Sequence, residues 1–141
     1  MAIYIHGGDI IFIKLTDSIT GRPVTVSRNN IVAISEASNG HCDLHLNCHI
    51  DIYVEESCER IILTKGFVRY TSYDFVEFTT TQGYKILFDI DSIIYIAEYN
   101  GEHGKIITTN GTFIVSDTYE YIDEILGRYT VIEDRRNICE S

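Results

Sequence analysis

Residues 12–36 read FIKLTDSITGRPVTVSRNNIVAISE, and residues 75–98 return to the same pattern as FVEFTTTQGYKILFDIDSIIYIAE. A second match joins residues 54–61 to residues 115–122. Matching positions carry the same residue or a similar apolar one, as in Phe12/Phe75, Thr16/Thr79, Gly21/Gly83, Val24/Ile86, Val26/Phe88, Ile31/Ile93, Ile34/Ile96, Glu36/Glu98 and Gly66/Gly127. The second copy is shorter by one residue at each of two loops, where chains tolerate deletions. We interpret the chain as two copies of one unit of roughly 55 residues, too few for a solenoid array.

Short runs of β-branched and aromatic residues fill both copies, and turn residues separate the runs. Val24 and Val26, for example, alternate with polar neighbours just after Gly21. Runs of this kind at intervals of about eight to twelve residues are typical of antiparallel sheets and small barrels. The dipeptide Asn110-Gly111 favours a two-residue type I′ turn, and it predicts the last hairpin of the chain.

Each copy is predicted to end in a short helix. In the second copy, Ser116 and Asp117 are the expected N-terminal cap, and apolar residues follow at helical spacing. In the first copy the helix is expected over residues 57–65. Gly66 and Gly127 lie where a left-handed cap would end each helix. We therefore predict a mainly β, α+β fold of two repeated antiparallel sheet or barrel units, each with four to five strands and a terminal helix.

The two units are expected to pack together, because a unit of this size buries little core alone. The predicted boundaries are residues 1–66 for the first β repeat with its helix, 67–74 for a connector, 75–129 for the second β repeat with its helix, and 130–141 for a polar tail.

The charge balance argues against binding to duplex nucleic acid. The chain has 21 Asp and Glu against 11 Lys and Arg, a formal net charge of −10. Proteins bind nucleic acid chiefly through clustered Lys and Arg, whose contacts release counterions. The charge balance does not exclude a local basic pocket for one small anion. It also does not exclude an acidic surface that binds a basic partner protein.

Hydropathy and cysteine usage indicate a cytoplasmic protein. No apolar run approaches the ~20 residues needed to cross a bilayer, so no membrane association is expected. The first residues lack the positively charged segment of a signal peptide. Without secretion, the four cysteines are expected to remain reduced thiols rather than form disulfides.

The second copy resembles the FlbD family of flagellar and swarming proteins. The resemblance comes from a glycine turn, an Asp followed by Ile-x-x-Ile-x-Glu, a Thr-Asn-Gly hairpin and a terminal helix; its residues are Phe88, Asp89, Ile93, Ile96, Glu98, Thr109, Asn110, Gly111, Val115, Ser116 and Ile122. It covers about 50 residues there and, more weakly, the first copy. Family members are single short units, so the duplication here departs from the family pattern, and the resemblance implies a small β fold but no particular function.

A cluster of three His and two Cys over residues 41–49 raises the question of zinc. On a strand, His41 and His45 would lie roughly 13 Å apart, too far to share one ion. A site could form only across the turn, from Cys48 and His49 with His45 or a partner chain. We expect strand residues here and no metal.

Arginine and tyrosine give the remaining signal of binding. Together they suit base stacking and bidentate capture of phosphate, and they equally suit a protein–protein contact. The candidate ligand-binding residues are Arg22, Arg28, Arg69, Tyr70, Tyr73, Tyr84 and Tyr99.

The sequence favours a non-catalytic binding protein, without cofactor and without catalytic residues. One hypothesis is a phage-encoded anti-defence sponge, a homo-oligomer in the bacterial host cytoplasm that sequesters a small anionic nucleotide signal. The alternative is an acidic protein-interaction module, either an inhibitor or a flagellar-type regulator, that binds a partner protein. A zinc-assisted hydrolase is the third and weakest hypothesis.

Overall fold

The computed structural model describes residues 2–6, 10–62 and 75–128. It is mainly β, as predicted. The described strands are β1 (Ala2–His6), β2 (Ile10–Thr16), β3 (Pro23–Ser27), β4 (Ile31–Glu36), β5 (Cys42–Leu46), β6 (Ile50–Val54), β7 (Phe75–Thr79), β8 (Lys85–Asp89), β9 (Ile93–Tyr99), β10 (His103–Thr108) and β11 (Thr112–Val115). The described helices are α1 (Cys58–Ile62) and α3 (Tyr119–Gly127). We call residues 10–62 the first half and residues 75–128 the second half.

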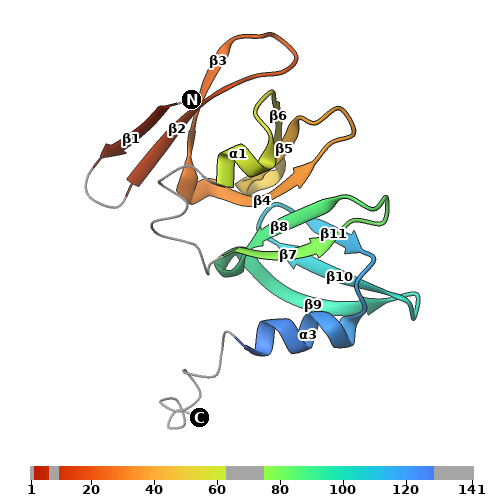
Figure 1. Ribbon diagram of the computed structural model, residues 1–141. Coiled ribbons are helices and arrows are strands. Elements are labelled where there is room, and N and C mark those ends of the chain that lie inside the picture. The colour runs from red at the N-terminus through yellow and green to blue at the C-terminus, as the bar shows by residue number, and fades with distance from the viewer. Residues whose placement is uncertain (1, 7–9, 63–74, 129–141) are drawn as a thin grey trace, which may run out of the picture.

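The strands form three antiparallel sheets (Figure 1). Two have three strands each, in the orders β1-β2-β3 and β11-β10-β9. The third has five strands in the order β6-β5-β4-β8-β7, so it takes strands from both halves. At its centre β4 pairs with β8, with Ile34 opposite Leu87. The halves are therefore joined by backbone hydrogen bonds as well as by side chains.

Register within each half is set by hairpins and by one bulge. The pairs that define the registers are Phe12–Ser27 and Ile34–Leu44 in the first half, and Phe75–Asp89 and Ile96–Ile106 in the second. The β4–β5 ladder shifts register between Ile31 and Ala33, and the β9–β10 ladder shifts between Ile107 and Thr108. Such a shift re-aims side chains locally, because one strand contributes an extra residue.

Two apolar clusters form the core. The first contains Ile13, Leu44 and Ile61 among other side chains of the first half. The second is built mainly from the second half, but it also contains Val32 and Ala33 of β4. The first half thus inserts part of its central strand into the core of the second half.

Three details of the predicted turns and caps are wrong. Thr118, not Ser116 or Asp117, caps α3, and its hydroxyl accepts a hydrogen bond from the Tyr121 amide at 3.2 Å. Gly127 lies inside α3, and the following Arg128 is right-handed, so no left-handed cap ends this helix. Asn110 does not have the positive φ that a type I′ turn requires. Its side chain is buried instead.

Helix α1 starts at Cys58, one residue after the predicted start, and it is described as far as Ile62. The predicted end at residue 65 lies outside the described residues. The hydroxyl of Ser57 accepts a hydrogen bond from the Arg60 amide at 3.1 Å and so caps its first turn. Gly66, the predicted connector over 67–74 and the predicted tail over 130–141 lie outside the described residues.

The described cysteines are free thiols, as expected. They are Cys42, Cys48 and Cys58, while Cys139 lies outside the described residues. Cys42 and Cys58 are buried together, with their sulfurs 2.8 Å apart. In the part of the chain that the structure describes, no helix is long and apolar enough to cross a membrane.

Candidate functional site

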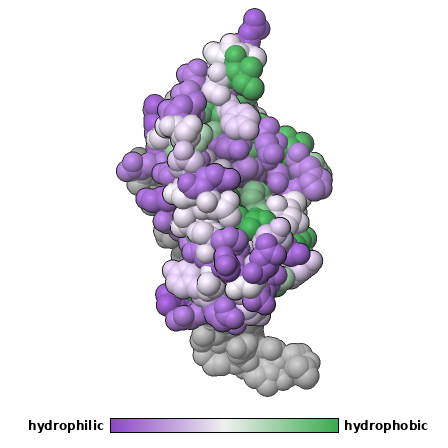
Figure 2. All heavy atoms as spheres, turned by 90° about the vertical axis from the view of Figure 1, so that its right-hand side faces the viewer, coloured by the Kyte–Doolittle hydropathy of each residue, from purple (hydrophilic) through white to green (hydrophobic). Residues whose placement is uncertain are grey.

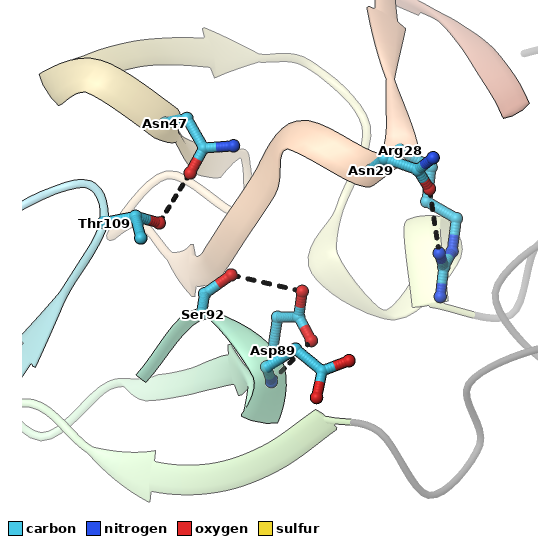
Figure 3. A pocket seen from close by; sticks show the side chains of 7 residues that line it. Arg28, Asn29, Asn47, Asp89, Ser92 and Thr109 are labelled. Atoms are coloured by element: carbon cyan, nitrogen blue, oxygen red, sulfur yellow. Dashed lines mark hydrogen bonds between the residues drawn. The ribbon is translucent and has the colours of Figure 1, made fainter. Parts of the chain in front are cut away.

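A polar pocket of about 360 Å³ opens where turns of the two halves meet (Figure 3). Its lining comes from four turns and one strand end: Arg28 and Asn29 between β3 and β4, Asn47 between β5 and β6, Asp89 at the end of β8 with Asp91 and Ser92 after it, and Thr109 between β10 and β11. Both halves contribute side chains, so the pocket depends on how the halves are joined. It is the best candidate for a ligand site among the described residues.

Asp89 is held in a fixed orientation at one wall of the pocket. Its two carboxylate oxygens accept hydrogen bonds from the Asp91 amide at 3.1 Å and from the Ser92 hydroxyl at 3.2 Å. Burial raises the pKa of the Asp89 carboxyl, and the charge of Asp91 acts in the same direction. The two hydrogen bonds and the positive charge of Arg28 oppose this rise. The result is an oriented acceptor with a weakened preference for the charged form.

Amides and hydroxyls line the other walls. Figure 3 shows Asn47 and Thr109 pointing toward each other from the two halves, with the Thr109 hydroxyl donating to the Asn47 side-chain oxygen. The Asn47 amide nitrogen donates to the Asn30 side chain at 3.0 Å. The guanidinium of Arg28 lies 3.5 Å from the Asn29 side-chain oxygen. The pocket thus combines one cation, two carboxylates and several neutral donors and acceptors.

The second half docks onto the first through the β10–β11 turn. The Asn110 side-chain nitrogen lies within hydrogen-bonding distance of three acceptors in the first half, namely Leu46 O at 2.6 Å, Asp51 Oδ1 at 3.2 Å and Ile50 O at 3.3 Å. The Cys48 amide donates to the Thr109 carbonyl at 3.2 Å. Cys48 and His49 adopt positive φ values of 66° and 64° in the receiving turn. This strained turn is part of the junction that forms the pocket.

Of the His and Cys residues of 41–49, His45 and Cys48 contact groups at this junction, whereas Cys42 packs against Cys58 and His41 lines a second pocket. His45 Nδ1 lies 2.9 Å from Asp51 Oδ1, and His45 Nε2 lies 2.9 Å from the Ser35 hydroxyl. The His45 ring also contacts Phe113 edge-on at 5.0 Å. Among the described residues, no three side chains of the metal-ligating types gather into a group that could hold an ion.

Those predicted ligand-binding residues that the structure describes do not meet in one place. Arg28 lines the pocket, whereas Arg22 is exposed in the β2–β3 turn and Tyr99 ends β9. Tyr84 lines a second pocket of about 350 Å³ beside β4 and α1. Arg69, Tyr70 and Tyr73 lie outside the described residues.

Sequence reasoning missed most of the residues that line the pocket. Asn47, Asp89 and Thr109 were not selected as ligand-binding residues, because none belongs to a local binding motif, and Asp89 and Thr109 were interpreted as parts of turn patterns. One signal was present: the strand registers put Asn47 and Thr109 at matching positions of the two halves. Polar residues at matching turns are expected to lie close together if the halves pack turn to turn.

Comparison of the chain with protein-family models, curated proteins and solved structures finds no match. The resemblance to the FlbD family therefore stays a prediction, and function must be argued from the pocket itself.

Proposed function

We propose that this protein is a duplicated β unit that binds a small nucleotide in the pocket between its halves, without transforming it. The observation that carries the proposal is the junction pocket, where Arg28 of one half lies near Asp89 of the other. Such concave sites with a few converging polar groups are the usual places for small ligands.

Matching contacts in the two halves support the duplication. The Thr16 amide donates to the Glu56 carboxylate at 3.0 Å, and the Thr79 amide donates to Asp117 at 2.8 Å. In the same way, isolated bridges join Asp17 to Val54 and Thr80 to Val115. In each half, the hydrogen bond and the bridge connect the first hairpin with the segment that precedes the helix. A duplicated unit explains why these side chains recur at equivalent places.

The chemistry of the pocket narrows the ligand. Oriented carboxylates such as Asp89 accept hydrogen bonds from the hydroxyl groups of a ribose. The planar guanidinium of Arg28 suits a phosphate, to which it can donate two hydrogen bonds. The amides of Asn29 and Asn47 can meet the edge of a base. Because two carboxylates accompany one arginine, we expect a nucleotide with few phosphates rather than a polyphosphate.

Thermal unfolding with a panel of nucleoside monophosphates, cyclic nucleotides and ADP-ribose tests this proposal. One member should raise the melting temperature of the wild type, and Arg28→Ala should lose that rise. Arg22→Ala is the matched control, since Arg22 is exposed in a turn outside the pocket. Mass spectrometry after denaturation should return the bound nucleotide intact, as a sponge requires. No rise with any nucleotide, or an equal rise in Arg28→Ala, would overturn the proposal.

The alternative is an acidic module that binds a partner protein, and one observation favours it. On α3, Glu120, Asp123 and Glu124 are exposed beside Tyr121. An acidic face next to an aromatic ring suits a basic partner. In this case a partner should be captured from host lysate and lost at high salt, while Tyr121→Ala should weaken the capture.

A further inference from the structure

Among the described residues, two strands keep an unpaired edge at places where their counterparts are paired. In the five-stranded sheet, β4 has β5 on one side and β8 on the other. Among the described residues, β9 pairs only with β10, although it occupies in the second half the place that β4 has in the first. Likewise β8 pairs with β7 and β4, whereas its counterpart β3 pairs, within the described ranges, only with β2. The open edges of β9 and β3 are thus the counterparts of the edges that join the halves.

Burial differs in the same way. Val32 and Ala33 follow the first residue of β4 and are both 0% exposed, because they enter the core of the second half. Ile94 and Tyr95 occupy the corresponding positions of β9, after the same register shift, and are 61% and 54% exposed. Large apolar side chains of this kind on a strand with a free edge indicate an interaction surface.

The sequence of β9 also lacks the residues that usually keep edge strands from pairing, although α3 packs beside this strand. Its sequence, IIYIAEY, contains one charged residue and neither lysine nor proline. Natural proteins usually protect exposed edges with such residues, because an open ladder recruits another strand. An unprotected apolar edge is expected where pairing is used.

The contact between the halves is not reciprocal. If a two-fold axis related the halves, β9 would pair with β3 whenever β4 pairs with β8. Among its described strands, the structure contains the β4–β8 pairing but not the β9–β3 pairing. A one-way contact between equivalent units leaves one free edge of each kind, so it can continue from copy to copy, as a ring if the rotation closes and as an open filament if it does not.

We propose that β9 of one molecule pairs antiparallel with β3 of a second copy of this chain, in the manner in which β4 pairs with β8. Figure 1 shows β3 at the top of the molecule and β9 in its lower part, beside α3, so the two edges lie far apart in this view. By analogy with the β4–β8 register, Tyr95 lies opposite Val26, Ile96 opposite Thr25, and Ala97 opposite Val24 of the second copy. Figure 2 shows a largely hydrophilic face with small separate apolar patches, in keeping with a contact that is carried by a strand edge.

Native mass spectrometry of the full chain tests this assembly. The wild type should contain more than one chain, and Ile94→Lys should reduce it to a monomer. Ile50→Lys is the matched control, since Ile50 is 51% exposed in β6, a strand that forms neither of the two proposed edges. Circular dichroism should show that both variants remain folded. A monomeric wild type, or an assembly that persists in Ile94→Lys, would overturn the proposal.

Cross-linking gives a second test that does not depend on a disruptive substitution. Residues opposite each other in an antiparallel ladder have Cα atoms about 4.5–5.5 Å apart, which suits a disulfide. The double variant Val24→Cys, Ala97→Cys should form disulfide-linked multimers on mild oxidation. The single variant Ala97→Cys should not form these disulfide-linked multimers. Equal cross-linking of both variants would contradict the register and the choice of strands.

Discussion

Strands β4 and β9 have similar sequences, IVAISE and IIYIAEY, but different neighbours. β4 is buried along most of its length between two strands, while β9 has one paired edge and exposes Ile94 and Tyr95. Two strands of similar sequence thus differ in burial because different elements pack against them. In the first half the cover is β8, and for β9 we propose that it is another molecule.

The largest expected effect comes from Phe88, which is 0% exposed in β8 at the junction of the halves. Its ring packs against Phe113 at 5.2 Å and Phe78 at 6.2 Å. Phe88→Ala should lower the free energy of unfolding by about 3–5 kcal/mol, measured by urea denaturation, because it leaves a cavity in the core. Tyr84→Ala, at an exposed neighbouring position, should change it by less than about 0.5 kcal/mol. Similar losses for both variants would contradict this description of the core.

The hydrogen bonds of Asn110 provide the next test of the comparison. Asn110 is 7% exposed and reaches acceptors in the first half. Asn110→Ala should therefore cost about 1–3 kcal/mol in urea denaturation, since the buried acceptors lose their donor. Asn39→Ala, in an exposed turn, should cost less. If the two variants are equally stable, the β10–β11 turn does not hold the halves together.

A smaller effect is expected at the helix caps. Thr118→Ala removes the side-chain acceptor at the start of α3 and should cost about 1 kcal/mol. Ser57→Ala removes the corresponding bond from the much shorter α1. Helical signals followed by circular dichroism should decrease more in Thr118→Ala. The reverse order would show that α1 contributes more helix than its five residues indicate.

The smallest effect concerns pH. Burial raises the pKa of Asp89 in the folded protein above its ordinary value of 3.8. Between these two pKa values the folded state binds more protons than the unfolded state, so stability falls as pH rises through that interval. Asp89→Asn lacks this ionisation, so its stability relative to the wild type should increase with pH from about 4 upward. Parallel pH profiles of the two proteins would contradict the raised pKa.

The sequence predicts local structure well and long-range pairing poorly. Alternation located the strands, and the glycine turns at Gly21 and Gly83 do adopt positive φ. The β4–β8 pairing was not predicted, because a pairing between distant strands leaves no local pattern. Asn110 was read as a turn former, yet its amide is used for hydrogen bonds between the halves. Of the pocket, only Arg28 was selected, since the other lining residues meet only after folding.

Hydrogen exchange on β4 and β9 tests the central claim most directly, namely that both strands are covered, one within the molecule and one between molecules. In the wild type, the amides of Ile93–Tyr99 should be protected to a degree similar to those of Ile31–Glu36. In Ile94→Lys, exchange should accelerate in β9 and stay unchanged in β4. Rapid exchange of β9 in the wild type, or equal protection of β9 in both proteins, would contradict the account.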